Sequence, residues 1–462
     1  MTPSFADPAS PSRTLHVVSS DDLPAWLVQQ PARWKTWLAG QRFDAALGEI
    51  RLLPAPDGAV AAAVVGFGTA RSRARSRFGI AGALQSLPPG NWHFEGTLSQ
   101  AQCNEAALGA LLGSYRFDRY RPCKTTPPQA LLKAPDGCDT DRITAMATGE
   151  FLTRDLINTP SSDMGPAELE TAFLTLAARF NAKTEVILGD DLITQNFPMI
   201  HAVGRASPRA PRIFSLRWGT GGPRVTLVGK GVCFDTGGLD IKPSAGMLLM
   251  KKDMGGAATV MGLAHMIMAL NLPVQLRVII PAVENSIAGN AMRPSDILTS
   301  RKGLTVEINN TDAEGRLILA DALAWADEET PDVIVSMATL TGSARVAVGP
   351  DLAPFYTDDE AFAAALSTAA PDACDPVWRM PFWNPYESMI EPKIADLDNA
   401  PAGGFAGSIT AALFLRRFVS CPRYMHFDIY GHTPSDAPAR PKGGVGQGAR
   451  ALLAALPKVL NL

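Results

Sequence analysis

Acidic side chains that could bind metal ions stand in two short segments of the chain. The first segment runs from Lys230 to Asp253 and includes Asp235, and the second includes Asp312 and Glu314. Carboxylates that lie close together repel one another, and burial makes each of them harder to ionise. A divalent cation relieves this repulsion; oxygen ligands suit Mg²⁺ and Mn²⁺, and Zn²⁺ accepts them too. Four carboxylates exceed the needs of one ion, so the pattern favours two divalent ions side by side.

Basic side chains in the same segments could act on a substrate. Lys242 and Arg316 are the cations expected to polarise a carbonyl group or to stabilise an oxyanion. Each piece has a simpler explanation when taken alone, because Asp-x-Glu pairs and single lysines are common on protein surfaces. Neighbouring glycines could also bind phosphate at a helix N-terminus. Their spacing fits neither the P-loop nor the dinucleotide-binding motif: Gly237, Gly238, Gly255 and Gly256.

Apolar runs that we predict to be buried strands precede these segments. The run 225–228 comes before Lys230, and the run 305–308 comes before Asp312. A third apolar run, 333–338, is also followed by a polar segment. In sheets of parallel strands, ligands bind beyond the carboxyl ends of the strands. We therefore expect three strand ends to bring the chemistry to one edge of a sheet.

Strands alternate with helices along most of the chain, which predicts an α/β fold with a mostly parallel sheet covered by helices on both faces. A chain of 462 residues is long for one core. We expect a small N-terminal α/β domain (1–135), a linker helix (136–160) and a larger catalytic domain (161–462). The predicted strands are 14–18, 50–54, 59–67, 185–187, 213–218, 225–228, 276–280, 305–308, 333–338 and 425–429. The predicted helices include 24–40, 101–115, 166–180, 257–270, 317–327 and 409–419.

Composition excludes several classes of partner. The chain has 42 basic and 45 acidic residues, a balance that gives no reason to expect nucleic acid. Its six cysteines are scattered, which favours reduced thiols in the cytoplasm over a disulfide framework. We see no signal peptide at the N-terminus. The stretch 254–276 has no charged residue, but Asn271 and Pro273 interrupt it, so we expect a buried helix and no membrane span.

The two segments closely resemble motifs of the leucyl aminopeptidase family of two-metal exopeptidases. The matching stretches are Lys230-Gly-Val-x-Phe-Asp-Thr-Gly-Gly-x-x-Ile-Lys-Pro, Met250-Lys-x-Asp-Met-Gly-Gly-Ala-Ala and Asn310-Thr-Asp-Ala-Glu-Gly-Arg-Leu. The last of these is the signature of the family. The resemblance covers residues 150 to 450, whereas the N-terminal domain matches loosely. The chain departs from the family near its end, where Gly448 stands in place of a frequent proline.

The resemblance implies a set of metal ligands. Lys230 and Asp253 would bind one ion, and Asp235 and Glu314 would bridge both ions. Asp312 would bind the other ion through its carboxylate and its backbone carbonyl. Lys230 must be neutral to act as a ligand, and two neighbouring cations would lower its pKa enough.

The resemblance also implies roles around the substrate. Lys242 would polarise the scissile carbonyl, and Arg316 would hold a bicarbonate ion that acts as the general base. Met250, Thr339 and Gly342 would line the pocket for the first side chain, which favours Leu- or Met-like residues.

The expected function is therefore that of a metal-dependent aminopeptidase that releases N-terminal residues from peptides. Manganese or zinc is expected, with magnesium as a third candidate, and the resemblance implies a homohexamer. Two alternatives stay open. A dipeptidase of narrow specificity would share every ligand. A DNA-binding regulator, as known among relatives, would need a basic surface that the near-neutral charge does not supply.

Overall fold

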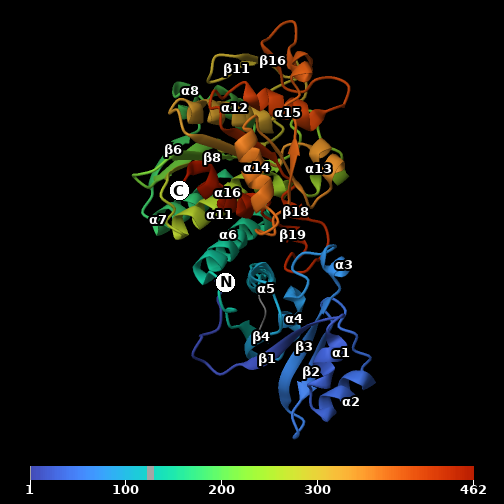
Figure 1. Ribbon diagram of the computed structural model, residues 1–462. Coiled ribbons are helices and arrows are strands. Elements are labelled where there is room, and N and C mark those ends of the chain that lie inside the picture. The colour runs from blue at the N-terminus through green and yellow to red at the C-terminus, as the bar shows by residue number, and fades with distance from the viewer. Residues whose placement is uncertain (1, 122–129) are drawn as a thin grey trace. The chain divides into compact units, whose positions relative to one another are not determined.

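The computed structural model describes residues 2–121 and 130–462 and divides the chain into two units (Figure 1). The first unit comprises Met1–Phe151 and Ser435–Lys442. The second comprises Leu152–Pro434 and Gly443–Leu462. Helix α6 (Thr140–Asn158) contains the point at which the first unit gives way to the second.

The first unit is built on a sheet with the strand order β2-β3-β1-β4-β5. All neighbouring strands are parallel except β2, which is antiparallel to β3. The strands are β1 (Arg13–Ser19), β2 (Ile50–Pro54), β3 (Val60–Gly68), β4 (Gly90–Glu95) and β5 (Ala130–Leu132). The helices before α6 are α1 (Leu23–Val28), α2 (Ala32–Gly40), α3 (Ala70–Arg73), α4 (Ala81–Ser86) and α5 (Gln100–Gly113).

Strand β3 shows how this sheet buries both of its faces. Ala63 and Val65 pack in one apolar cluster, whereas Ala62 and Val64 pack in another. Alternate residues of a strand point to opposite faces, so both faces of this sheet are covered. The predicted helix 24–40 is wrong in one respect. It is broken into α1 and α2 because Pro31 stands at the start of α2, and a proline inside a helix removes a backbone hydrogen bond.

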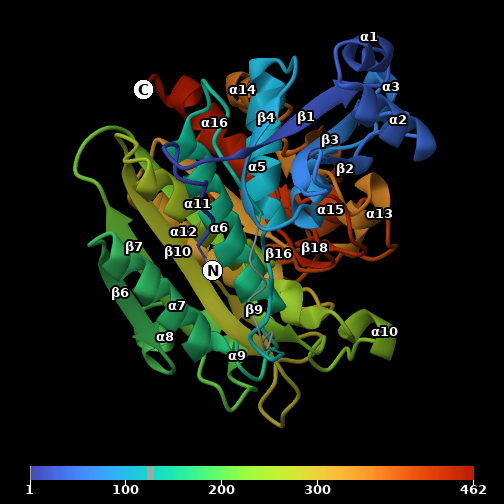
Figure 2. The same cartoon turned by 90° about the horizontal axis from the view of Figure 1, so that it is seen from below.

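The second unit contains a large central sheet with the order β15-β14-β17-β13-β8-β10-β7-β6, and β9 pairs with the far end of β10. The parallel pairs of this sheet include β17–β13, β13–β8, β8–β10 and β9–β10. The antiparallel pairs are β10–β7, β7–β6 and β14–β17. Figure 2 shows β10 running beside β7, with β6 beyond it. The strands are β6 (Lys183–Leu188), β7 (Arg212–Trp218), β8 (Arg224–Gly229), β9 (Gly231–Asp235), β10 (Gln275–Asn285), β13 (Val333–Ala338), β14 (Ala353–Tyr356), β15 (Val377–Met380) and β17 (Tyr424–Asp428).

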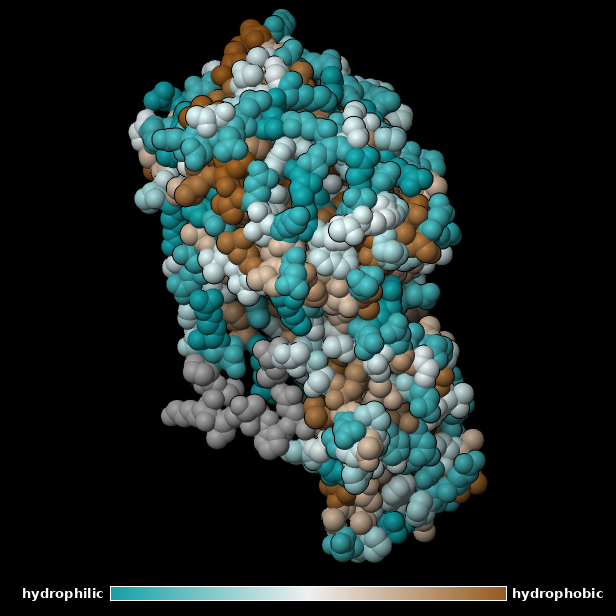
Figure 3. Space-filling model, turned by 90° about the vertical axis from the view of Figure 1, so that its left-hand side faces the viewer, coloured by the Kyte–Doolittle hydropathy of each residue, from teal (hydrophilic) through white to brown (hydrophobic). Residues whose placement is uncertain are grey.

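Helices cover both faces of this sheet, which confirms the predicted fold class. In Figure 1, α12 and α15 lie on one side of the strands, and α11 and α16 lie on the other. The helices of this unit are α7 (Pro166–Arg179), α8 (Asp191–Thr194), α9 (Pro198–Gly204), α10 (Ser244–Met247), η1 (Met250–Met254), α11 (Gly255–Ala269), α12 (Gly315–Asp327), α13 (Gly342–Val348), α14 (Glu360–Ala369), η2 (Asn384–Ile390), α15 (Gly407–Arg416) and α16 (Ala449–Leu460). Over this unit, the face shown in Figure 3 is largely hydrophilic, with separate apolar patches.

Helix α11 accounts for the charge-free stretch of the sequence. All of its residues up to Met268 are buried. Asn271 follows the helix in the left-handed conformation (φ 48°), and the chain then returns as β10. Within the described part of the chain, no helix combines the length and the apolar character needed to cross a membrane. The stretch is therefore a core helix, as expected.

The strand before Asp312 does not belong to the central sheet, which corrects the expectation of three strand ends on one sheet edge. It is β12 (Thr305–Glu307), which pairs with β11 (Ile297–Thr299) and β16 (Leu397–Asp398) in a small separate sheet. The physical cause is a tight turn in which Gly303 donates to Ser300 O (2.9 Å), and this turn folds β12 back onto β11. The short strands β18 (His432–Thr433) and β19 (Gly443–Gly444) pair with each other.

Gly448 precedes α16 with φ +80°. Proline cannot adopt this angle, because its ring holds φ near −65°. A Cβ at this position would also lie 2.8 Å from Phe427 Cε1. The departure from the family pattern therefore goes with a different local backbone at the start of the last helix.

Candidate metal centre

Lys230 stands between β8 and β9, where the chain moves from the central sheet toward the carboxylates. Its backbone N donates to Met337 O (3.0 Å), and its carbonyl accepts from Ala257 N (2.9 Å). These bonds attach it to β13 and to the start of α11. Its ammonium lies 2.7 Å from Asp253 Oδ2 and 3.1 Å from Glu314 Oε1. Lys230 thus joins a residue of each predicted segment.

Lys242 makes the corresponding link on the other side of the cluster. Its ammonium lies 2.9 Å from Asp235 Oδ2 and also forms an ion pair with Asp312. Asp235 ends β9, and Gly237 N donates to its Oδ1 (2.8 Å). Oxygen atoms of three carboxylates all lie within 4.8 Å of one another: Asp235, Asp312 and Glu314. Such a group of oxygens has the chemistry of a divalent-cation site.

The two predicted segments do meet, and they are bonded to each other. Thr311 N donates to Asp240 Oδ2 (2.8 Å), and Asp240 N donates to Thr311 Oγ1 (2.8 Å). Asn285, at the end of β10, donates from Nδ2 to Asp235 Oδ1 (2.9 Å) and to Thr311 O (3.1 Å). Our sequence reasoning missed Asn285. The signal was a polar residue at the carboxyl end of a long apolar strand.

Thr339 connects β13 to the cluster. Its hydroxyl donates to Asp253 Oδ1 (2.8 Å), so the carboxylate of Asp253 is oriented by Thr339 and Lys230 together. Met250 begins η1, the short helix that carries Asp253. Gly342 begins α13, and a Cβ placed there would meet no atom within 4 Å. The expected pocket residues therefore lie on the two elements that flank Asp253, with open space at Gly342.

Asp428 holds the loop that contains Thr339; a buried, hydrogen-bonded role is what the sequence favours for it, but its partners were not predicted. Its Oδ1 accepts from the backbone N of Leu340 (3.1 Å) and of Thr341 (2.9 Å). Its Oδ2 accepts from Thr341 Oγ1 (2.6 Å) and from Ser408 Oγ (2.8 Å). Asp428 is buried at the end of β17, 88 residues from Leu340, so no local sequence signal links them.

The charges of the cluster are balanced only in part. Burial and the neighbouring Asp235 raise the pKa of Glu314 to about 8. Burial and the same neighbour raise the pKa of Asp312 to about 6. Burial opposes the charge of Lys230, but Asp253 and Glu314 outweigh it and raise its pKa. The carboxylates thus resist ionisation together, and a divalent cation would remove that resistance.

Arg316 begins the buried side of α12 beside the cluster. It is 8% exposed, and neither its Nε nor its Nη1 has a hydrogen-bond partner among the described residues. Burial lowers its pKa to about 10, against the attraction of Asp428 and Glu314. Buried donors without acceptors are costly, so this guanidinium fits a small anion.

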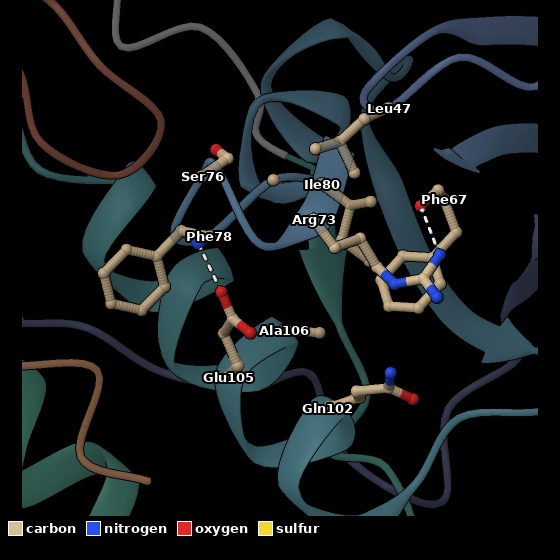
Figure 4. Close-up of a pocket in the computed structure, with 10 residues that line it drawn as sticks. Leu47, Phe67, Arg73, Ser76, Phe78, Ile80, Gln102, Glu105 and Ala106 are labelled. Atoms are coloured by element: carbon tan, nitrogen blue, oxygen red, sulfur yellow. Dashed lines mark hydrogen bonds between the residues drawn. The ribbon is translucent and has the colours of Figure 1, made fainter. Parts of the chain in front are cut away.

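A separate cavity of about 110 Å³ lies in the first unit (Figure 4). Its charged groups already have protein partners. Arg73 donates to the carbonyls of Phe67 and Gly68 (both 3.0 Å), and Glu105 accepts from Phe78 N. Because both charged side chains bind the protein backbone, this cavity has no cluster of carboxylates comparable to that of the metal centre within the described residues.

Comparison with known proteins agrees with this geometry. The catalytic domain of the cytosol aminopeptidase family matches residues 151–453, and the N-terminal domain of M17 aminopeptidases matches residues 14–135. The chain belongs to the cytosol aminopeptidase family. It is 39% identical over 373 residues to the probable cytosol aminopeptidase of Roseiflexus castenholzii, covering 75% of each chain. It is 37% identical over 441 residues to that of Methylobacterium radiotolerans, covering 90% of this chain and 87% of the relative.

Two solved structures superpose closely on this chain. The crystal structure of the cytosol aminopeptidase from Coxiella burnetii is 43% identical, with a TM-score of 0.92 and 98% of each chain covered. The bottromycin maturation enzyme BotP in complex with Mn is 29% identical, with a TM-score of 0.87 over 97% of this chain and 100% of BotP.

Family membership confirms the main functional prediction. The protein is a metal-dependent aminopeptidase, a hydrolase that acts on peptides. The acidic group of Asp235, Asp312 and Glu314 is where the chain could hold metal.

Proposed function

We propose that this aminopeptidase binds two divalent ions with the ligand set expected from the sequence. Lys230 and Asp253 would hold one ion, Asp312 the other, and Asp235 and Glu314 both. The observation that carries the proposal is the gathering of three carboxylates within 4.8 Å, flanked by Asp253 on the far side of Lys230. When bound, the ions would lower the pKa of water and attract the free amino group of a peptide.

Lys242 and Arg316 would act on the substrate from opposite parts of this cluster. Lys242 is a half-buried cation at Asp235 and Asp312, so its ammonium can donate a hydrogen bond to the scissile carbonyl and stabilise its developing charge. The unpartnered Nε and Nη1 of Arg316 support a role in holding bicarbonate, which would accept a proton from water.

The pocket for the first side chain would be bordered by Met250, Thr339 and Gly342. Thr339 contacts Asp253 directly, and Gly342 leaves open space at the start of α13. Such a pocket would accept Leu- or Met-like side chains. Pockets of this kind distinguish neighbours that differ by one methylene by only about 1–3 kcal/mol.

We further propose a cytoplasmic homohexamer that uses Mn²⁺ or Zn²⁺, with Mg²⁺ as a weaker substitute. Manganese is present in the BotP structure. Large apolar side chains stand exposed on this chain, and assembly would cover them: Leu248 (80% exposed), Val346 (82%) and Phe405 (83%). The names of the relatives and the scattered cysteines support the cytoplasm.

Hydrolysis of a leucine anilide by the purified protein tests the proposal. We expect chelator to remove the activity, and added Mn²⁺ or Zn²⁺ to restore it more fully than Mg²⁺. Folded, metal-loaded protein that cleaves no anilide with any ion would overturn the broad aminopeptidase proposal in favour of a narrow dipeptidase.

A further inference from the structure

A lysine without an acidic partner lies beside the metal centre. Lys252 directly precedes Asp253 in η1 and is only 6% exposed. Within the described residues, its ammonium has no ion pair, because Asp253 directs its own carboxylate to Lys230 and Thr339. Burying a charge without a counter-charge costs several kcal/mol. A largely buried lysine whose ammonium forms no ion pair within the described residues therefore calls for a functional explanation.

The ring of Tyr430 lies beside this ammonium, and a second cation shares that ring. Lys252 Nζ lies 4.9 Å from the ring centroid, and Arg345 Cζ also lies 4.9 Å from it. Arg345 is on α13 and, within the described residues, has no acidic partner. A cation–π contact attracts each cation to the face of the ring, but it supplies no negative charge. Lys252 and Arg345, here called the cation pair, thus place two cations on one ring, and neither forms an ion pair within the described residues.

The cation pair borders the proposed substrate pocket. Lys252 is next to Asp253, and Arg345 lies one helical turn after Gly342. Tyr430 is followed by Gly431, and a Cβ on Gly431 would lie 3.1 Å from Thr339 Cγ2. All three side chains therefore lie on segments that contact or continue from Thr339. A substrate held at the metal centre would meet positive charge on this side.

We propose that Lys252 and Arg345 bind a carboxylate of the substrate, which makes this enzyme prefer peptides that carry a carboxylate close to the metal centre. The proposal rests on the proposed function. A carboxylate that enters between the metal centre and α13 would supply the missing counter-charge, and charge-assisted hydrogen bonds are about twice as strong as neutral ones. It can come from Asp or Glu at the first position, or from the C-terminus of a dipeptide. The pocket of Met250, Thr339 and Gly342 would still accept Leu- or Met-like side chains, and the cation pair would add a preference for substrates with a negative charge.

Two substrate pairs separate these sources. Glutamyl anilide against leucyl anilide varies only the side chain, because anilides have no C-terminal carboxylate. Leu-Ala against Leu-Ala amide varies only the C-terminal carboxylate. The ratio of kcat/KM within each pair measures the preference and cancels any general loss of activity. Each ratio is compared between the metal-loaded wild type and its variants.

Lys252→Met removes the buried charge and keeps the length of the side chain, whereas Lys252→Arg keeps the charge. Arg345→Met changes an exposed residue, so it tests the same pocket without disturbing the core. Lys458→Met, at an exposed position on α16, is the matched control. We expect Lys252→Met to lower one ratio at least about tenfold and Arg345→Met at least about threefold. Lys252→Arg and Lys458→Met should lie close to the wild type.

A change in the anilide ratio would assign the first side chain as the source, and a change in the dipeptide ratio would assign the C-terminus. Wild-type enzyme that cleaves leucyl anilide, with neither ratio altered by Lys252→Met or Arg345→Met, would overturn the carboxylate site and leave the aminopeptidase proposal intact. Folded, metal-loaded wild type that cleaves none of the four substrates would overturn both.

Discussion

Lysines alternate with carboxylates through the metal centre. Lys230 and Lys242 each contact two carboxylates, and burial together with the neighbouring Asp235 raises the pKa of Glu314. Bound metal ions would neutralise these carboxylates in place of the lysines and protons. We therefore expect each carboxylate to contribute more to metal binding than to the stability of the fold. Loss of one ligand should therefore affect catalysis far more than folding.

Asp312 offers the clearest test, because it is the more exposed of the three clustered carboxylates. Its side chain is 31% exposed, so Asp312→Ala leaves no large cavity. We expect kcat to fall by more than about a thousandfold, with the thermal midpoint changed little. Asp372→Ala, at an exposed position, is the control. Retained turnover in Asp312→Ala would contradict its place among the ligands.

Arg316 can be tested by chemical rescue. Arg316→Ala removes the buried donors that we assign to bicarbonate, so kcat should fall by about a hundredfold, within the range for loss of a general base. Added bicarbonate should restore part of the rate while bound metal, measured by elemental analysis, stays constant. A rate equal to that of the wild type would refute the role of Arg316, and an equal loss of metal would show a structural role instead.

At the scale of elements, the site depends on a loop that is held from behind. The loop after β13 carries Thr339, and Asp428 of β17 accepts two of its backbone N–H groups. Neighbouring parallel strands place these residues side by side, since Ala338 pairs with Asp428 in the register of the sheet. The sheet thus positions a carboxylate whose hydrogen bonds, among the described residues, go to the loop and to Ser408.

Asp428→Asn should loosen this loop. The amide would retain one oxygen acceptor but turn a donor toward hydroxyls and N–H groups. We expect the free energy of unfolding to fall by about 2 kcal/mol, and kcat/KM to fall as Thr339 loses its position. Asp332→Asn is the control, because exposed Asp332 accepts a single backbone hydrogen bond from Arg224. Denaturant unfolding and anilide kinetics measure the two effects, and equal values for both variants would contradict the role of Asp428.

Helix α11 contains a histidine that makes stability depend on pH. His265 is buried against Phe180, and burial lowers its pKa from 6.5 to about 4. The folded state therefore prefers neutral His265, and its contribution is full above pH 6.5. As the pH falls from 6.5 toward 4, His265 binds a proton in the unfolded state but not in the folded state. The free energy of unfolding therefore falls by up to about 3 kcal/mol.

His265→Leu removes this proton uptake. We expect the thermal midpoint of the wild type to drop relative to that of the variant as the pH is lowered from 6.5 to 4. Above pH 7 the difference should be constant. A difference that does not vary across the acidic range would contradict the buried, neutral state of His265.

At the scale of the whole molecule, exposed apolar side chains and family membership both lead us to expect a homohexamer. Sedimentation equilibrium should report about six times the 49.1 kDa mass of the chain. Val346→Glu, which places a charge on an 82% exposed apolar position of α13, should shift the protein toward smaller species. A monomer at micromolar concentration in the wild type would contradict the homohexamer.

The sequence alone determined the chemistry, the family and the fold class. All three could be predicted because the candidate ligands lie within short segments and because hydrophobic periodicity is a local property of the sequence. It also identified α11 as a core helix from its interrupting residues. The two predicted segments meet, as the bonds between Thr311 and Asp240 show, although the strand before Asp312 lies in a separate small sheet.

Only the tertiary structure decided which distant residues support the site. Strand pairing is non-local, so the sequence could not place β12 in its small separate sheet or set Asp428 behind the loop of Thr339. The same holds for Lys252 and Arg345, 93 positions apart in the sequence, which meet at one tyrosine ring. Such contacts arise from packing between elements, and packing depends on every element at once. For that reason, the kind of reaction could be predicted from local residues, whereas the charge that surrounds the substrate could be seen only in the folded chain.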